Sequence, residues 1–270
     1  MSQHAAGERV RLDAFGESPE DALARCVRLE SMPFPTGAAL APTDVVVEVA
    51  SAGVALIDAM MLSGQYHHKP PLPFTPGMEY AGIVRWTGSA VDPARLAVGD
   101  RVFNDYLLSG PRSAGAHASQ GGWASYAVAP QDALHRVPAG LSMDQAANFL
   151  LNFETAHFAL VVRGGLRAGE VLLVNGASGA AGLAAVQVGK LLGAIVIAAG
   201  RSDVKLAHAR AAGADHVINV SPSVAGEAVR KFRDDVKERT GGRGADLVFD
   251  TVGGAVSAEC LRSLAFGGVT

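Results

Sequence analysis

The sequence predicts an α/β protein, with a β-rich first domain over residues 1–140 and a doubly wound parallel sheet over residues 141–270. Three observations carry this prediction. A chain of 270 residues is longer than a single hydrophobic core usually supports. Short strand patterns separated by Pro and Gly fill its first half. From residue 171 onward, apolar strand patterns alternate with helical ones, which is the rhythm of a parallel sheet covered by helices.

The first domain is expected to be a half-buried antiparallel sheet or barrel, because several of its apolar segments alternate with polar residues. The segment at 67–76, HHKPPLPFTP, is too rich in proline for a helix or a central strand, so we expect an irregular loop there. The predicted strands cover residues 9–12, 25–29, 45–49, 82–86, 101–103 and 124–128.

Helical patterns begin near the predicted domain boundary. Ser142 can cap a helix that runs to Leu150, and a second helix is expected from Thr155 to about Arg163. The elements expected after them, strand and helix in turn, cover 171–175, 180–192, 194–199, 203–212, 216–220, 223–239, 245–251 and 254–265. Only four strands are legible where about six are expected, and another strand begins at 266–270, so we expect a truncated sequence.

A glycine turn follows the buried strand at 171–175. Gly176, Ala177, Gly179, Ala180 and Gly182 lie between this strand and the next helix. Without side chains in the way, a pyrophosphate can approach the backbone, and the N–H groups at the helix start point at it. The turn therefore predicts a dinucleotide site, although alanine replaces the first glycine of the usual pattern. The alternative is a structural turn that binds no nucleotide.

The residues after the second strand bear on the choice of cofactor. Arg201 can donate charge-assisted hydrogen bonds to a phosphate, Ser202 can add a neutral one, and Lys205 is close enough in sequence to help. Asp203 is acidic, but we expect it in the first helical turn, where it favours the helix dipole. This pattern favours NADPH over NADH. The alternative is that Arg201 is a solvated surface residue.

Composition excludes several classes of function. The formal net charge is −3 and there is no basic run, so we expect a small-molecule substrate and neither nucleic acid nor an anionic membrane as partner. Cys26 and Cys260 are too few for a disulfide framework and are expected to be inert core residues. No apolar stretch resembles a signal peptide or a bilayer span. These features predict a soluble cytoplasmic protein.

Several motifs, in this order and spacing, resemble the medium-chain dehydrogenase/reductase superfamily and, within it, the zinc-independent quinone oxidoreductase branch. They are GVALID at 53–58, GQY at 64–66, PGME at 76–79 with Gly82, VGDRV at 98–102, GGWA at 121–124 with Tyr126, Thr155 with Ala156, the glycine turn, and GADHV at 213–217. The resemblance implies a GroES-like catalytic domain at 1–140, an incomplete Rossmann NAD(P)-binding domain at 141–270, and a cofactor cleft between them. It also implies that the full-length protein can form a homodimer.

The resemblance also bears on zinc. The positions that hold catalytic zinc in the alcohol dehydrogenase branch look like Ala55, Met78 and Glu79 here. Alanine and methionine cannot supply a tetrahedral set of thiolate, imidazole or carboxylate ligands, so no metal is expected. The adjacent His67 and His68 are expected to be solvated loop residues.

Without a Lewis acid, we expect substrates that are already electrophilic, namely quinones or α,β-unsaturated carbonyls. The resemblance places Tyr66 where related enoyl thioester reductases carry a proton donor, although it could also be a packed tyrosine. Asp58 is assigned to the catalytic site as a residue that organises a loop or orients donors. Family members often have asparagine at the position of Ala55 and tyrosine at that of Met60, so part of the usual polar wall is missing.

Three further residues are predicted to contact the cofactor. The resemblance places Asn152 and Thr155 near the nicotinamide, although both could be helix-cap or packing residues. Asp250, Thr251 and Val252 follow the fourth strand at its carboxyl end, where such sheets bind ligands, and we expect a contact from Val252.

The leading functional hypothesis is an NADPH-dependent, zinc-independent reductase of quinones or enones. Two alternatives stay open: an enoyl thioester reductase that uses Tyr66 as proton donor, and a non-catalytic, crystallin-like NADPH-binding protein. The substrate itself cannot be identified from the sequence.

Overall fold

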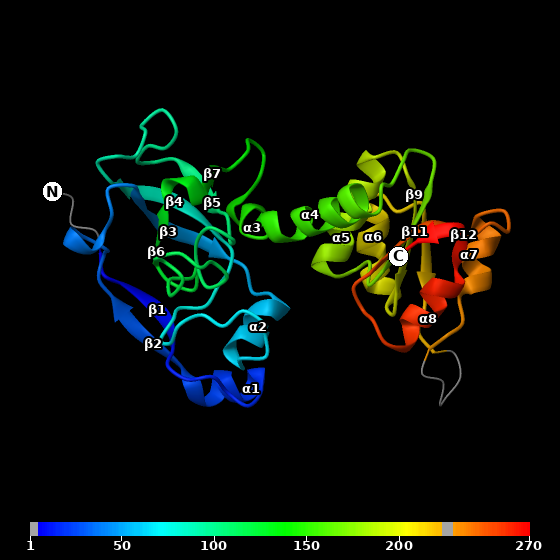
Figure 1. Ribbon diagram of the computed structural model, residues 1–270, viewed down its shortest axis with the longest axis horizontal. Coiled ribbons are helices and arrows are strands. Elements are labelled where there is room, and N and C mark those ends of the chain that lie inside the picture. The colour runs from blue at the N-terminus through cyan, green and yellow to red at the C-terminus, as the bar shows by residue number, and fades with distance from the viewer. Residues whose placement is uncertain (1–4, 223–228) are drawn as a thin grey trace. The chain divides into compact units, whose positions relative to one another are not determined.

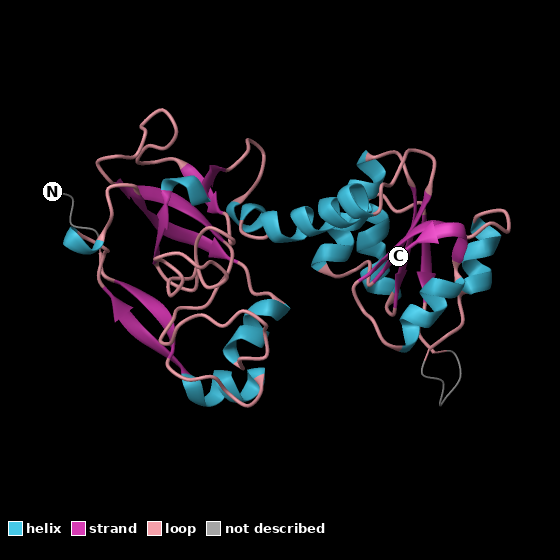
Figure 2. Ribbon diagram, viewed as in Figure 1, coloured by secondary structure: helices cyan, strands magenta, loops and turns pink. Residues whose placement is uncertain are grey.

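The computed structural model describes residues 5–222 and 229–270. The chain forms two compact units, Met1–Leu150 and Leu151–Thr270, and each is described by itself (Figure 1). The first unit is rich in strands and the second alternates strands with helices (Figure 2). The α/β prediction with a β-rich first domain and a parallel sheet in the second is therefore confirmed. The boundary at residue 140, which was drawn on sequence character, stays a prediction.

The first unit is built on a five-stranded antiparallel sheet in the order β6-β3-β4-β5-β7, beside a hairpin of β1 and β2. Val45, Val47 and Tyr80 lie in its core with no exposed surface, since alternate residues of a strand point to the same face. The strands are β1 (Gly7–Leu12), β2 (Val27–Met32), β3 (Asp44–Ala52), β4 (Tyr80–Thr87), β5 (Arg101–Asn104), β6 (Tyr126–Pro130) and β7 (Leu134–Arg136).

Short helical segments complete this unit: α1 (Pro19–Asp21), a π-helical turn (Ala22–Cys26), 3-10 turns at Gly37–Ala39 and Gln131–Ala133, α2 (Leu56–Leu62) and α3 (Met143–Ala146). The strand predicted at 25–29 was wrong at its start, because Cys26 ends the π-helical turn. Helix α2 was not predicted, since Ala55 has no side chain that can cap it. Ser142 does cap α3, as predicted, and accepts a hydrogen bond from the Gln145 N–H at 3.1 Å. The predicted end at Leu150 was wrong, because α3 ends at Ala146 and a separate helix begins at Leu150.

The second unit is a five-stranded parallel sheet in the order β10-β9-β8-β11-β12. Its strands are β8 (Val171–Asn175), β9 (Ile195–Gly200), β10 (His216–Asn219), β11 (Ala245–Asp250) and β12 (Leu264–Val269). Its helices are α4 (Leu150–His157), a π-helical segment (Phe158–Arg163), α5 (Ala180–Leu191), α6 (Asp203–Ala211), α7 (Arg233–Arg239) and α8 (Ala255–Arg262).

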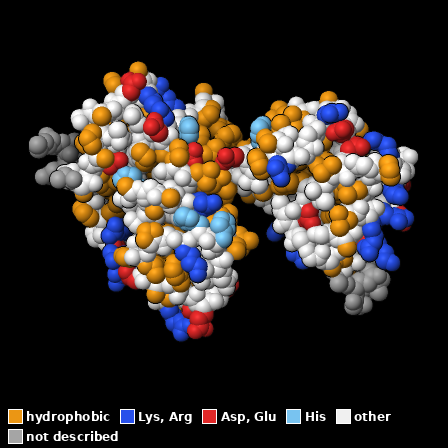
Figure 3. Space-filling model, viewed as in Figure 1, with side chains coloured by type: hydrophobic (Ala, Val, Ile, Leu, Met, Phe, Trp, Pro, Cys, Tyr) orange, Lys and Arg blue, Asp and Glu red, His pale blue; other side chains and the backbone are white. Residues whose placement is uncertain are grey.

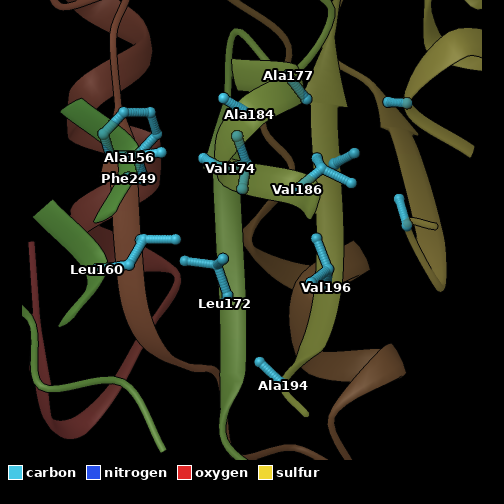
Figure 4. Close-up of a cluster of buried hydrophobic side chains, with 14 of the residues drawn as sticks. Ala156, Leu160, Leu172, Val174, Ala177, Ala184, Val186, Ala194, Val196 and Phe249 are labelled. Carbon is cyan, nitrogen blue, oxygen red and sulfur yellow. The ribbon is translucent and has the colours of Figure 1, made fainter. Parts of the chain in front are cut away.

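Both faces of this sheet are buried, as a parallel sheet requires. Leu172 and Val174 of β8 point into one apolar cluster together with Val186 of α5 and Val196 of β9 (Figure 4). Val171 and Leu173 lie in a second cluster, which includes residues of α7 and α8. The continuous apolar run at 171–174 is explained by this two-sided burial.

Several predicted bounds in this unit were wrong. The helix expected from Thr155 is the end of α4 followed by the π-helical segment. The helix expected at 223–239 is α7, and residues 223–228 lie outside the described part of the chain. The helix expected at 254–265 ends at Arg262, because β12 begins at Leu264. The described residues of this unit therefore contain five strands, not four. No helix within the described residues is long and apolar enough to cross a membrane.

Candidate functional site: a glycine-lined groove at the sheet edge

The turn after β8 depends on two glycines. Gly176 has φ +74°, and a Cβ there would lie 2.7 Å from Thr251 Oγ1. A Cβ on Gly182 would lie 2.3 Å from the carbonyl oxygen of Gly176, so only glycine lets α5 approach the turn so closely. The glycines therefore bring the start of α5 against the end of β8.

The start of α5 is open to a ligand. Gly179 is the N-cap residue and is exposed, with no side chain to cover the N–H groups of the first turn. These groups have no partner within the helix and carry the positive end of its dipole. Ala180 is the first helical residue, and Ala177 is fully buried beneath the turn, where its N–H donates to the Ala199 carbonyl at 3.1 Å.

A groove of about 810 Å³ opens at this edge of the sheet. Five of the residues predicted to bind the cofactor, which lie at the glycine turn and after β9, line this groove. The loop after β11 lines it as well. Its lining among the described residues is Asn175, Gly176, Ser178, Gly179, Gly200, Arg201, Ser202, Lys205, Val220, Pro222, Val229, Thr251, Val252, Gly253, Ala255 and Val256. It lies at the carboxyl ends of parallel strands, where open α/β sheets bind ligands.

The cationic end of the groove follows β9. Ser202 caps α6 by accepting a hydrogen bond from the Lys205 N–H at 3.4 Å, and Asp203 begins the helix, as predicted. Arg201 and Lys205 are exposed, and no described residue forms an ion pair with either. Both cations are therefore available to an anionic group in the groove.

A polar clamp closes the opposite side of the turn. The Asn175 side-chain amide donates to Asp250 Oδ1 at 2.8 Å, and the same oxygen accepts from the Val252 N–H at 2.9 Å and the Gly253 N–H at 3.3 Å. The Ser257 hydroxyl donates to Oδ2. Burial opposes ionisation of Asp250, but these donors outweigh it and hold the pKa of the carboxyl below its ordinary value.

Sequence reasoning did not find Asn175. It ends a fully buried strand, and its side chain is 2% exposed. A buried amide requires hydrogen-bond partners, so an asparagine directly before the glycine turn was a usable signal. Val252, which was predicted, lies 2.9 Å from the position of a Cβ on Gly176 and lines the groove.

Asp58 lies in the other compact unit and holds backbone groups. Its carboxylate accepts from the Ala55 N–H at 2.8 Å, which caps α2, and from the Met78 N–H at 3.0 Å. Burial raises the pKa of Asp58 above its ordinary value, although backbone donors including Gly77 act in the opposite direction. These contacts are those of a residue that organises a loop; a catalytic role stays a prediction.

Tyr66 is half-buried in the loop after α2, where its ring lies 4.1 Å from that of His67. Met78 and Glu79 are buried, and Ala55 is the N-cap residue of α2. Within residues 5–222 and 229–270, no three His, Cys, Asp or Glu side chains gather in a group that could hold a metal ion. Asn152 and Thr155 lie on α4 and are not among the residues that line the groove.

Charged side chains of both signs occur together on one face of the molecule. On the face shown in Figure 3, Lys and Arg are interspersed with Asp, Glu and neutral residues. This distribution accords with the formal net charge of −3.

Two family models match the chain. The alcohol dehydrogenase GroES-like domain matches residues 41–139, and the domain described as zinc-binding dehydrogenase matches residues 180–270. The first match falls within the β-rich unit and the second within the unit of the parallel sheet. The two units are therefore a GroES-like domain and a Rossmann-like domain.

Individual relatives agree with these matches. The chain is 38% identical over 240 residues to quinone oxidoreductase-like protein 2 of Mus musculus, covering 88% of this chain and 61% of that protein. It spans 57–61% of the length of several such relatives.

Solved structures extend the comparison. A quinone oxidoreductase of Pseudomonas syringae superposes with a TM-score of 0.73 and is 30% identical, covering 98% of this chain and 75% of that one. A mycobacterial protein complexed with NADPH gives a TM-score of 0.75 at 30% identity, covering 97% of this chain and 73% of that one. The chain belongs to the quinone oxidoreductase branch of the medium-chain dehydrogenase/reductase superfamily.

Proposed function

We propose that this protein is an NADPH-dependent, zinc-independent oxidoreductase that reduces quinones or α,β-unsaturated carbonyls. The observation that carries the proposal is the groove at the edge of the parallel sheet, which joins a helix start without a side-chain cap to two exposed cations, Arg201 and Lys205, that form no ion pair with a described residue. A dinucleotide with a further phosphate on its adenosine ribose has two anionic groups. Its pyrophosphate suits the helix start, and the further phosphate suits the two cations. A relative solved with NADPH supports the same cofactor.

The residues present fit this cofactor. The N–H groups at the start of α5 would hold its pyrophosphate, since Gly179 is exposed and the glycines leave room for close approach. Arg201 and Lys205 would hold the 2′-phosphate, and Val252 would contact the cofactor from the loop after β11. When bound, the nicotinamide supplies hydride to the substrate.

Zinc is not part of the proposed mechanism, because the residues at the expected ligand positions cannot bind it. Ala55 and Met78 occupy two of the positions that carry ligands in zinc-dependent relatives, and neither is a zinc ligand. The buried carboxylate of Asp58 is already engaged by backbone donors. A substrate with its own electrophilic carbon requires no Lewis acid, so the chain's residues would mainly orient it and exclude water.

A nicotinamide-absorbance assay tests this function. The chain, and a longer form of the same protein, are incubated with NADPH or NADH and with quinones, enones and enoyl thioesters. We expect oxidation of NADPH by a quinone or enone, with no loss of rate in the presence of a zinc chelator. Binding of NADPH without turnover of any substrate would favour the non-catalytic reading, and equal affinity for the two cofactors would overturn the cofactor assignment.

Tyr66 favours a second candidate, an enoyl thioester reductase. The tyrosine is half-buried and lies in the loop after α2, where its ring packs beside that of His67. Substitution Tyr66→Phe removes the hydroxyl alone. A loss of most turnover with enoyl thioesters would support proton donation by Tyr66, whereas unchanged turnover with quinones would support the leading proposal.

We also propose a cytoplasmic setting, which is supported by the two free thiols of Cys26 and Cys260. Burial raises the pKa of Cys260 to about 12, which disfavours the thiolate form of this side chain. Formation of a homodimer by a longer form of the protein stays a prediction, and its molar mass in solution tests it.

A further inference from the structure

The peptide unit between Arg201 and Ser202 determines where the cationic end of the groove lies. Gly200 precedes it and adds no side-chain restraint of its own. A peptide unit is planar, so the direction of the Arg201 carbonyl also determines the direction of the Ser202 N–H. Ser202 in turn caps α6 and thereby orients the turn that carries Lys205.

This peptide unit is held from outside the groove by Ser221. The Ser221 hydroxyl donates to the Arg201 carbonyl at 2.6 Å, twenty positions earlier in the chain. Ser221 itself is fixed by its N–H, which donates to Asn219 Oδ1 at 2.9 Å. Val220 and Pro222 line the groove on either side of it, but Ser221 does not.

The support extends behind Ser221. The Val220 N–H donates to the Gly200 carbonyl at 2.9 Å, which continues the pairing of β10 with β9. Arg230 donates to the Asn219 carbonyl at 2.7 Å and forms an ion pair with Asp235 of α7 at 3.0 Å. The end of β10 is therefore held by Gly200 of β9 and by Arg230. The Ser221 hydroxyl, which follows this end, in turn holds the Arg201 carbonyl.

We propose that Ser221 is a positioning residue for recognition of the 2′-phosphate: its hydroxyl holds the Arg201–Ser202 peptide so that Arg201 and Lys205 face the phosphate together. This inference rests on the proposed use of NADPH. It goes further in assigning cofactor discrimination to a residue that does not line the groove. Ser221 therefore affects the affinity for NADPH, and leaves the affinity for NADH unchanged because NADH lacks the phosphate.

The test measures the dissociation constants of NADPH and NADH for the wild type, Ser221→Ala and Ser221→Thr by nicotinamide fluorescence. Loss of one hydrogen bond to the Arg201 carbonyl should weaken NADPH binding about three- to tenfold in Ser221→Ala. NADH binding should not change, and Ser221→Thr, which keeps a hydroxyl on Cβ, should restore the wild-type preference. In turnover assays the KM for NADPH should rise while kcat stays the same.

Ser113→Ala is the matched control, because the Ser113 hydroxyl donates to the Gly110 carbonyl at 2.8 Å in the other compact unit. It should leave the cofactor preference unchanged, and unfolding temperatures of all variants separate local effects from loss of the fold. If the wild type prefers NADPH and Ser221→Ala retains that preference, the inference is overturned and the proposed function stands. If the wild type shows no preference, the cofactor assignment fails and the inference fails with it.

Discussion

The side-chain amide of Asn175, at the end of β8, donates to the carboxylate of Asp250, at the end of β11, at 2.8 Å. The two residues are 75 positions apart in the chain. Because Asp250 also accepts from the Val252 and Gly253 N–H groups, this contact fixes the loop that lies against Gly176. The shape of the groove beside the glycine turn therefore depends on a bond between two neighbouring strands.

Substitution Asp250→Ala should loosen this loop. The Asn175 amide would remain buried without its partner, so we expect the free energy of unfolding to fall by about 1–3 kcal/mol. The loop that carries Val252 would also lose its anchor beside the groove, so the dissociation constant for NADPH should rise about tenfold, which corresponds to about 1.4 kcal/mol of binding free energy. Calorimetry and cofactor titration measure the two effects.

Asp246 offers a control on the same strand. It accepts from the Val171 N–H at 2.8 Å and pairs with Arg243 at 2.9 Å, near the start of β11. Asp246→Ala should lower stability while leaving NADPH affinity unchanged. Equal loss of affinity in both variants would show that the clamp acts only through general stability.

Two alanine substitutions in the glycine turn should have different effects. A Cβ on Gly182 would meet the Gly176 carbonyl oxygen at 2.3 Å, so Gly182→Ala forces the backbone apart and should destabilise the protein by roughly 1–3 kcal/mol. Gly179 has φ −79°, and its nearest contact would be at 3.4 Å. Gly179→Ala should therefore fold normally.

The same Gly179 variant should nevertheless bind NADPH more weakly, because its added methyl group lies at an exposed helix start that lines the groove. Thermal unfolding and fluorescence titration of both variants separate stability from affinity. Wild-type affinity in Gly179→Ala would argue against pyrophosphate binding at this helix start.

Arg201→Ala should reduce the affinity for NADPH and spare that for NADH. A hydrogen bond to a charged group contributes about 1.5–3 kcal/mol, so we expect a loss of roughly ten- to a hundredfold for NADPH alone. Dissociation constants measured at two salt concentrations check the electrostatic origin, since screening should diminish the difference. Lys205→Ala is the companion variant, and an equal loss for both cofactors would contradict the assignment.

Asp58 and Asp250 should influence stability with opposite dependence on pH. The pKa of Asp250 lies below that of an unfolded aspartate, about 3.9, so its contribution is present above that pH and is lost as the pH falls through the folded value. The pKa of Asp58 is raised, so its linked contribution is present at low pH and is lost as the pH rises through the folded value.

Asp250→Asn should therefore cost more stability at pH 7 than near pH 2, below the folded pKa, whereas Asp58→Asn should cost more near pH 2 than at pH 7. Thermal unfolding of the two variants and the wild type across this range measures both trends. The same trend in both variants would show that one of the two carboxyl groups ionises differently from this description.

Local patterns in the sequence determined the elements that lie next to one another in the chain. The strand at 171–175, the glycine turn and helix α5 form one continuous stretch, so periodicity and glycine spacing sufficed to predict them. The Ser142 cap and the placement of Asp203 at the start of α6 are also local. Family motifs likewise indicated the two-domain class, since they occur in a fixed order along the chain.

Tertiary structure decided what depends on partners far away in sequence. The Asn175–Asp250 hydrogen bond and the Ser221–Arg201 hydrogen bond each join the ends of neighbouring strands. Local sequence patterns do not predict which strands are neighbours in a sheet, so these bonds could not be predicted. Helix α2 was missed for a related reason. The N–H of its N-cap residue, Ala55, donates to the carboxylate of Asp58 within the helix, and that carboxylate also accepts from the Met78 N–H, 20 positions away. Sequence alone thus predicted a dinucleotide site at the glycine turn, and long-range hydrogen bonds decided how the groove beside that turn is held in shape.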